Sequence, residues 1–217
     1  MKKLKVLLIE DHALTRLGLV TALNSFDLIE SVIEAEDAES AIEIFKQEDP
    51  DIVLMDLGLV GMDGIQATKE LKKIQPNTKI IILTSHNSEE ETMSAIEAGA
   101  SAYCLKDIQK TRLLQVIESI SEGAVWIDPA VANAILKRIS NKETPKNKEQ
   151  TLSAPNLTDR EKEVLKLLAG GCSNSEMASR MCVSINTVKV HICNILQKLD
   201  VEDRTQAAIK ALKLNIV

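Results

Sequence analysis

The chain has 217 residues, 45% hydrophobic and 27% charged, which fits one large or two small globular domains. Only 2% are aromatic, so an aliphatic core is expected, and no run approaches the roughly 18 apolar residues that a membrane helix needs. The net charge of −6 is unevenly divided: residues 1–128 carry 12 Lys or Arg and 23 Asp or Glu, whereas residues 129–217 carry 14 and 9. An acidic part joined to a basic part predicts two roles, with a polyanion as a partner of the second.

Two features of the sequence bear on the compartment. The opening MKKLKVLLIED combines lysines with an apolar run, as a signal peptide does, but the run is too short and two acids follow at once. We therefore expect a first β-strand there. The cysteines at 104, 172, 182 and 193 form neither a CxxC pair nor a zinc spacing with histidine, so reduced, buried thiols in a cytoplasmic protein are expected.

The first half alternates short apolar runs with helical patterns. The runs are rich in Val, Ile and Leu, as strands buried on both faces of a sheet are; they lie at 5–9, 29–35, 52–55, 79–84 and 102–105. Helical patterns follow them near 14–25, 38–47, 64–74, 89–98 and 108–122. Asp63 with Gln66 and Ser88 with Glu91 have the spacing of helix caps. Five strands alternating with five helices predict a doubly wound α/β domain with a parallel sheet.

A change in composition marks the middle of the chain. Asp128 and Pro129 suit the start of a helix, which is expected to run to about residue 140. Residues 141–156 are polar, contain two prolines and have almost nothing to bury, so they are expected to form a linker.

The last part of the chain has helical patterns and no strand pattern. Residues with the spacing of N-terminal caps precede three of the helices, namely Thr158 with Glu161, Ser173 with Glu176 and Asp203 with Gln206. Ser184 can cap the remaining helix, at 185–199. We therefore predict an all-α, four-helix domain, and divide the chain into a domain at 1–127, a linker helix and linker at 128–156, and a second domain at 157–217.

Chemically useful side chains stand at the carboxyl ends of the predicted strands, where ligands bind in a doubly wound sheet. Glu10 and Asp11 end the first strand, and Asp56, Thr84 and Lys106 end the third, fourth and fifth. Clustered carboxylates need a hard cation such as Mg²⁺, which prefers oxygen ligands. Asp56 is then a candidate nucleophile that forms an acyl phosphate, while Lys106 and Thr84 can contact phosphate oxygens.

These residues belong to motifs that resemble those of response-regulator receiver domains. The motifs are LIEDH at 8–12, DIVLMDL at 51–57, MDG at 62–64, LTS at 83–85 and AYCLK at 102–106. The resemblance covers roughly residues 4–124 and implies Asp56 as phosphoacceptor and Lys106 as a phosphate contact. It also implies Mg²⁺ ligation by Glu10, Asp11, Asp56 and the main-chain carbonyl of Gly58, and a switch pair of Thr84 and Tyr103.

Other readings of the acidic cluster remain open. Receivers often have Met-Pro-Gly where this chain has Leu59-Val-Gly61, which bears on the rigidity of the loop and the lifetime of the phosphoryl group. A degenerate receiver could use its acids for solubility alone. A Mg²⁺-dependent phosphatase typically needs a second carboxylate two residues after the nucleophile, and position 58 is glycine. His12 and His86 flank the predicted pocket, and we expect solvated or locally hydrogen-bonded side chains there rather than catalytic ones.

Two short helices joined by a tight turn, at 174–181 and 185–199, have the helix-turn-helix pattern. Val188, Ile192, Ile195 and Leu199 recur at three- and four-residue spacing and predict the inner face of the second helix. The opposite face offers a cation, small polar groups and an apolar contact for a thymine methyl, which suits a DNA groove. Its residues are Asn186, Thr187, Lys189, Val190 and Asn194.

The strings LTDREKEVL at 157–165, SEMA at 175–178 and TVKVH at 187–191 resemble the LuxR-type helix-turn-helix domain. Cys193 stands where such regulators often carry a further basic residue that faces DNA, so weaker binding to the DNA phosphates is expected. Lys198, Arg180 and Arg204 are alternative backbone contacts, or ordinary surface charges. The resemblance also implies a homodimer through the last helix, at 203–213, although its alanines could equally be core.

With the receiver in front, the whole chain resembles the NarL/FixJ response regulators. That resemblance implies a non-enzymatic transcriptional regulator that a sensor histidine kinase phosphorylates on Asp56 and that binds double-stranded DNA as a dimer. In this pattern the unphosphorylated receiver blocks the recognition helix. The alternative is a DNA-binding protein that works without phosphorylation and uses its receiver for docking.

Overall fold

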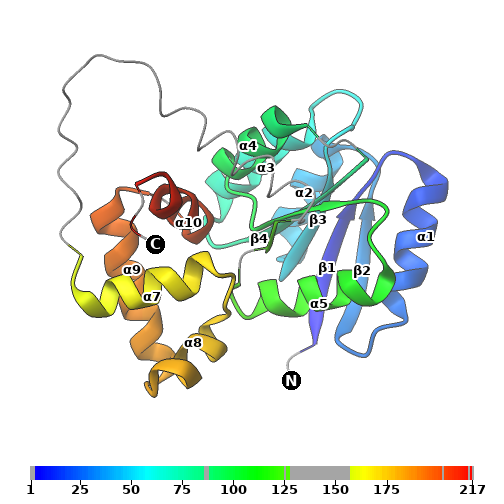
Figure 1. Cartoon of the computed structure of the whole chain (residues 1–217). Coiled ribbons are helices and arrows are strands. Elements are labelled where there is room, and N and C mark those ends of the chain that lie inside the picture. Colours follow the sequence, from blue (N-terminus) through cyan, green and yellow to red (C-terminus); the bar gives the residue numbers. More distant parts are fainter. Residues whose placement is uncertain are drawn as a thin grey trace, which may run out of the picture. The chain divides into compact units, whose positions relative to one another are not determined.

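The computed structural model describes residues 3–85, 88–124, 126–127, 157–201, 203–214 and 216. The chain divides into two compact units, one of residues 1–121 and 126–128 and one of residues 122–125 and 129–217, and each is described by itself (Figure 1). The helix expected after Asp128 and the polar linker expected at 141–156 lie outside the described residues.

The first unit is a parallel sheet with helices on both faces. Its strands are β1 (Leu4–Ile9), β2 (Ile29–Ala35), β3 (Ile52–Asp56), β4 (Lys79–Thr84), β5 (Ala102–Leu105) and β6 (Trp126–Ile127). Its helices are α1 (Ala13–Asn24), α2 (Ala38–Glu48), α3 (Gly64–Ile74), α4 (Glu89–Glu97) and α5 (Lys110–Ser121). The strand order is β2-β1-β3-β4-β5-β6, and every neighbouring pair is parallel. The predicted doubly wound domain, with its five strands and five helices, is confirmed.

The two-residue strand β6 was not predicted. It extends the sheet by pairing Trp126 with Ala102 and Ile127 with Tyr103. Two residues are too few to show the alternation or the apolar run by which a strand is recognised in a sequence.

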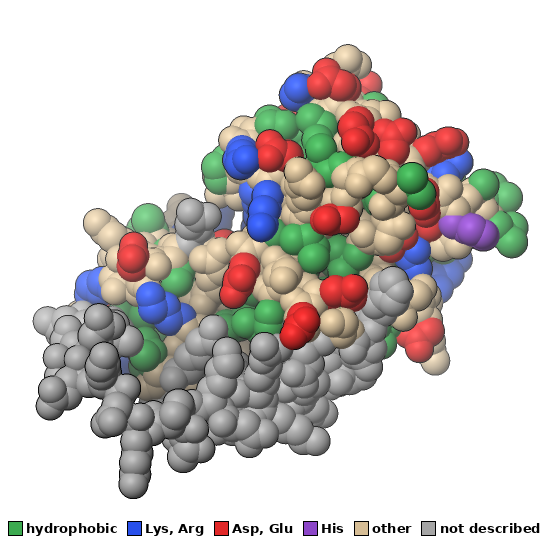
Figure 2. Space-filling model, turned by 90° about the horizontal axis from the view of Figure 1, so that it is seen from above, with side chains coloured by type: hydrophobic (Ala, Val, Ile, Leu, Met, Phe, Trp, Pro, Cys, Tyr) green, Lys and Arg blue, Asp and Glu red, His purple; other side chains and the backbone are tan. Residues whose placement is uncertain are grey.

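Burial on both faces explains the apolar strands. Every residue of β3 is buried, and α1 and α5 cover one face of the sheet while α2, α3 and α4 cover the other (Figure 1). One core cluster joins Leu23 of α1 and four residues of α5 to the strands beneath them. Figure 2 shows Asp and Glu side chains spread over the visible face of this unit, as the sequence count predicts.

The second unit is a four-helix domain of α7 (Asp159–Ala169), α8 (Asn174–Met181), α9 (Ile185–Leu199) and α10 (Arg204–Lys213). Thr158 and Ser173 form full capping boxes with Glu161 and Glu176, and Ser184 caps α9 by accepting from the Thr187 amide. The predicted helix starts are thus confirmed. Among the helices of the described ranges, none is long and apolar enough to cross a membrane.

The expectation that all four cysteines are buried is wrong for two of them. Cys104 and Cys172 are buried free thiols, but Cys182 and Cys193 are exposed. Cys182 ends α8 in a left-handed conformation, with φ 53°, at the turn of the helix-turn-helix. Cys193 lies on α9 two residues before Ile195, which is fully buried, and therefore on a different face of the helix.

Candidate functional site

The carboxyl ends of neighbouring strands bring the predicted acidic residues together. Glu10 follows β1 and Asp56 ends β3, the strand next to it. Glu10, Asp11 and Asp56 each offer one carboxylate oxygen, and these oxygens lie within 4.8 Å of one another. Glu10 and Asp56 are 1% and 6% exposed, so the cluster sits at a largely desolvated edge of the sheet.

Lys106, which follows β5, reaches into this cluster. Its Nζ lies 2.8 Å from Asp56 Oδ2 and 2.8 Å from Glu10 Oε2. Desolvation lowers the pKa of Lys106, but the hydrogen bonds and charges of the two carboxylates outweigh it, so the pKa is raised above its usual 10.5 and the ammonium stays protonated. Lys106 carries one positive charge against three carboxylates. Hard oxygen donors with an excess of negative charge fit a Mg²⁺ ion.

Backbone contacts fix the loop between β1 and α1. The Glu10 amide donates to the Ala35 carbonyl at 3.1 Å, and the His12 amide lies 3.3 Å from Glu10 Oε1. The His12 ring caps α1 by accepting from the Thr15 amide, which confirms the expectation of a locally hydrogen-bonded histidine. His86 lies outside the described residues.

Two glycines shape the loop between β3 and α3. A Cβ on Gly64 would lie 2.1 Å from the Asp56 carbonyl oxygen, and the Gly64 amide donates to the Leu57 carbonyl at 3.2 Å. Only glycine allows α3 to start this close to the candidate nucleophile. A Cβ on Gly58 would lie 3.7 Å from Asp56 Oδ2, so the main chain of Gly58 is next to the cluster. Val60, in the stretch that lacks proline, is 79% exposed.

The two predicted switch residues are both buried. Thr84 ends β4, is 1% exposed, and its carbonyl accepts from the Lys106 amide at 2.9 Å. Tyr103 is fully buried on β5; burial raises its pKa, partly offset by a hydrogen bond with the Thr92 side chain. Thr92 of α4 is a contact that the sequence reasoning missed, because no motif marks it.

The exposed face of α9 is the one predicted for DNA. Its residues Asn186, Thr187, Lys189, Val190, Cys193 and Asn194 are all exposed. Val188 and Ile195 are fully buried in the domain core, and Val190 is 59% exposed. An apolar side chain exposed beside Lys189 on one helix face suits the floor of a major groove.

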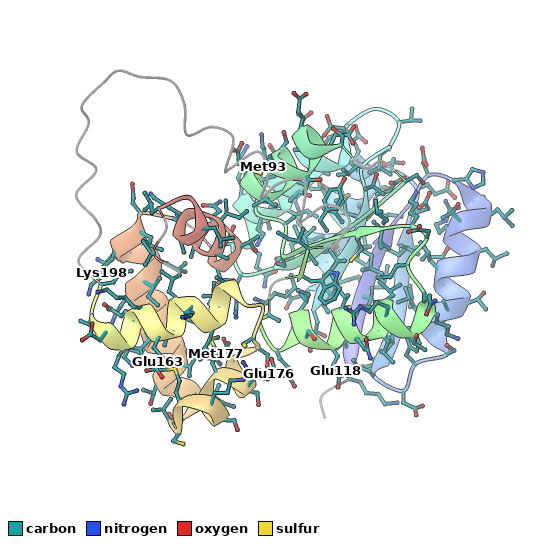
Figure 3. All side chains as sticks on the ribbon, in the orientation of Figure 1. Met93, Glu118, Glu163, Glu176, Met177 and Lys198 are labelled. Atoms are coloured by element: carbon teal, nitrogen blue, oxygen red, sulfur yellow. The ribbon has the colours of Figure 1, made fainter. Side chains whose placement is uncertain are left out.

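Two of the alternative phosphate contacts are engaged inside the domain. Lys198 Nζ lies 2.7 Å from Glu161 Oε2, near the start of α7 (Figure 3). Glu161 is 3% exposed and also accepts from the Thr158 amide at 2.7 Å and its hydroxyl at 2.9 Å. The bond from Lys198 lowers the pKa of Glu161. Arg204 donates to the Cys172 carbonyl at 2.9 Å and to Asn174 Oδ1 at 3.0 Å, whereas Arg180 is exposed.

The alanines of α10 belong to the core of their own domain. Ala207 and Ala211 are fully buried and Ala208 is 7% exposed, packed in one cluster with α7, α8 and α9. Their burial supports the core alternative for these residues, so a dimer through α10 would need its other face.

Comparison with known proteins agrees with this arrangement. The family model described as the response regulator receiver domain matches residues 6–118, and the one described as bacterial regulatory proteins, luxR family, matches residues 155–211. The chain therefore belongs to the response regulators that join a receiver to a LuxR-family DNA-binding domain, which are two-component transcriptional regulators.

Relatives of known name resemble the chain over its full length. Transcriptional regulatory protein LiaR of Bacillus subtilis is 39% identical over 214 residues, and response regulator protein VraR of Staphylococcus aureus is 36% identical over 214 residues, each with 99% of both chains covered. Among solved structures, response regulator ChrA of a heme-sensing two-component system has a TM-score of 0.54 at 34% identity, covering all of both chains. RcsB of Salmonella typhimurium has a TM-score of 0.60 at 25% identity, covering 96% of this chain and 97% of that one.

Proposed function

We propose that a sensor histidine kinase phosphorylates Asp56 of the receiver domain, and that this modification controls binding of the second domain to double-stranded DNA. The observation that carries the proposal is the cluster of Glu10, Asp11 and Asp56 oxygens within 4.8 Å beside Lys106. Three clustered carboxylates repel one another and destabilise the fold unless enough positive charge joins them. Such a destabilising cluster is expected where it has a function.

In the proposed reaction an oxygen of the Asp56 carboxylate attacks phosphorus while the bond from phosphorus to the donor's imidazole nitrogen breaks, leaving an acyl phosphate. The donor departs as a neutral imidazole, because its other ring nitrogen already carries a proton. A Mg²⁺ ion held by Glu10, Asp11, Asp56 and the Gly58 carbonyl would neutralise the charge of the phosphoryl group. Lys106, already 2.8 Å from Asp56 Oδ2, pairs with a phosphate oxygen, and the Thr84 hydroxyl hydrogen-bonds to another.

The proposed switch connects this reaction to α4. When Thr84 turns to the phosphoryl group, Tyr103 takes a new rotamer and gives up its hydrogen bond with Thr92. Since Tyr103 is fully buried, such a rotation requires the packing between β5 and α4 to change.

In the second domain, α9 enters the major groove, with Asn186, Thr187, Lys189, Val190, Cys193 and Asn194 toward the DNA. We propose a homodimer through α10, a receiver at 1–127, a linker at 128–156, a DNA-binding domain at 157–217 and a cytoplasmic location. The unphosphorylated receiver blocks α9 in this scheme.

Phosphoryl labelling tests the first half of the proposal. Acetyl phosphate with Mg²⁺ should add one acid-stable, base-labile phosphoryl group, which intact-mass spectrometry detects. Asp56→Asn should remove it, whereas the matched control Asp107→Asn, at an exposed carboxylate beside Lys106, should label normally. Stoichiometric labelling of Asp56→Asn would disprove the assignment. Labelling that leaves DNA affinity unchanged would favour the alternative regulator that works without phosphorylation, and rapid turnover with free phosphate released would favour the phosphatase.

Binding of Lys189→Ala to specific and random duplexes at several salt concentrations tests the second half. Loss of a base contact should cost roughly 1–3 kcal/mol and relax preference at one position. Loss of a phosphate contact should weaken all sequences alike and lower the salt slope by about one unit. Wild-type affinity for both duplexes in a folded variant would show that this face of α9 is not the reading surface.

A further inference from the structure

Arg16, in the first turn of α1, contacts the main chain of the acidic site rather than its carboxylates. Its Nη1 donates to the main-chain carbonyl of Glu10 at 2.8 Å. Its Nη2 lies 2.7 Å from Glu36 Oε1 and its Nε lies 3.4 Å from Glu34 Oε2, both at the end of β2. The Arg16 side chain is only 12% exposed, so one guanidinium spans the ends of two neighbouring strands at a largely buried position.

The carbonyl that Arg16 holds belongs to the peptide that joins Glu10 to Asp11. Because the peptide unit is planar, fixing this carbonyl fixes the plane that contains the Cα atoms of both residues, and so restricts the directions in which their side chains project. The Arg16 amide also donates to the His12 carbonyl at 3.0 Å, which is the first main-chain hydrogen bond of α1 and joins the loop to the helix whatever side chain stands at position 16. The Glu10 amide is bound to Ala35 of β2. Both hydrogen-bonding groups of the Glu10 main chain are therefore occupied.

Two neighbouring carboxylates offset the positive charge of Arg16. Glu34 and Glu36 are 48% and 75% exposed and each contacts the guanidinium, so they offset its positive charge. An unpaired guanidinium close to the metal site would repel Mg²⁺. Because the charge of Arg16 is offset by Glu34 and Glu36, its net repulsion of the ion is small. The planar guanidinium donates hydrogen bonds to two acceptors, the Glu10 carbonyl and Glu36, and pairs with Glu34 through a third nitrogen, which an ammonium on a flexible stem does not match.

We infer that Arg16 is a positioning residue for the metal site: it holds the Glu10–Asp11 peptide so that both carboxylates face Asp56. This inference rests on the proposed Mg²⁺ site. It goes beyond the ligand set, because Arg16 contributes no ligand, and it assigns a function to a residue of α1 that lies outside the motif at 8–12. Glu34 and Glu36 support Arg16 in turn.

Titration of Mg²⁺ into the full chain by calorimetry, without a phosphodonor, tests the inference. Arg16→Met should raise the Mg²⁺ Kd about tenfold, as loss of a group that orients a ligand does. Arg16→Lys should raise it in the same direction, because it keeps the charge and loses the three-way contact. Lys46→Met is the matched control; it removes one cation from an exposed pair with Glu43 at 2.6 Å on α2 and should leave Kd unchanged.

The labelling rate supplies a second readout that a merely structural role would not move. In Arg16→Met the rate with acetyl phosphate should fall at low Mg²⁺ and return to that of the unaltered chain at saturating Mg²⁺, with the folded fraction checked by circular dichroism. Should Arg16→Met not fold, Arg16→Lys provides the same comparison.

The outcomes separate the two claims. An unaltered chain that binds no Mg²⁺ overturns the metal site and, with it, this inference. An unaltered chain that binds Mg²⁺, together with wild-type or tighter Kd in the Arg16 variants, overturns the positioning role alone. An Arg16→Lys variant that matches the unaltered chain while Arg16→Met does not would assign the effect to charge, and would also overturn it.

Discussion

Both domains contain buried carboxylates bound to a lysine, and the two arrangements differ in how completely the charge is matched. In the DNA-binding domain, Glu161 accepts hydrogen bonds from Lys198 and from the amide and hydroxyl of Thr158. The negative charge of Glu161 is therefore balanced by one lysine, and its carboxylate also completes the cap of α7. In the receiver, the one ammonium of Lys106 contacts Glu10 and Asp56, and Asp11 adds a third carboxylate within 4.8 Å. A balanced pair holds a fold together, whereas an unbalanced cluster has capacity left for a ligand.

Val188→Asp should break the DNA-binding domain and spare the receiver. Val188 is fully buried, so the change places an unpaired charge in the core, at a cost on the order of 4 kcal/mol or more. Amide hydrogen exchange should show α7 to α10 unprotected while Asp56 still accepts a phosphoryl group. The control is Val190→Asp, at a side chain 59% exposed, which should stay folded and lose only DNA binding. A receiver that unfolds together with Val188→Asp would show that the two domains are not independent.

Gly64→Ala should damage the receiver and leave the DNA-binding domain folded. The new Cβ would lie 2.1 Å from the Asp56 carbonyl oxygen, and a backbone atom cannot move away cheaply, so we expect a loss of about 3 kcal/mol and slower labelling. Gly18→Ala in α1 meets no atom within 4 Å and should stabilise the helix by up to about 1 kcal/mol. Urea unfolding followed by Trp126 fluorescence measures both. Equal stability of the two variants would contradict the close approach at Gly64.

Glu161→Gln should lower the stability of the DNA-binding domain, because the pair of Glu161 and Lys198 has a structural role. We expect a loss of about 1–2 kcal/mol, because a charged acceptor is replaced and Lys198 is free to turn to water. The pKa of Glu161 is lowered from 4.5 by Lys198, so the stabilisation is fully present above pH 4.5 and is lost as the pH falls through the lower folded value. Hydrogen exchange of α9 amides from pH 7 down to pH 3 should show this dependence in the unaltered domain and lose it in the variant.

Glu163→Gln is the matched control for that measurement. Glu163 lies on the same helix, exposed and 2.7 Å from Arg160 (Figure 3). Surface pairs of this kind contribute at most about 1 kcal/mol, so its effect should be small. If the two variants behaved alike, burial of Glu161 would have no energetic consequence.

Cys193→Lys should produce the smallest effect, in DNA binding alone. An added cation on the exposed face of α9 should strengthen binding to all duplexes and steepen the salt dependence by about one unit. Cys193→Ser, which adds no charge, should keep the original slope. An unchanged slope for Cys193→Lys would place this position away from the DNA backbone.

The sequence predicted those features that local pattern controls. Apolar runs located β1 to β5 within a few residues, and capping spacings located the starts of α7 and α8. The acidic cluster was also predictable, because strand ends in a parallel sheet meet at one edge, and Glu10 and Asp56 are strand-end residues.

Contacts between residues far apart in the chain could not be predicted from the sequence. Lys198 and Glu161 are 37 positions apart, and nothing in either helix indicates that one will reach the other. Arg16 resembles any other cation of an amphipathic helix until the fold brings Glu36 beside it. The cysteines were misjudged for a similar reason: average tendencies describe residue types, whereas the exposure of Cys193 depends on which face of α9 packs against α7.

The two exposed thiols give the unmodified protein a built-in footprinting probe. Cys104 and Cys172 are buried and Cys182 and Cys193 are exposed, so a brief alkylation of the folded chain marks the DNA-binding domain and leaves the receiver unmarked. Cys193 lies on the face proposed to enter the groove, while Cys182 ends α8. The ratio of their alkylation rates with and without duplex DNA, read peptide by peptide in a mass spectrometer, therefore reports occupancy of α9 without any engineered residue.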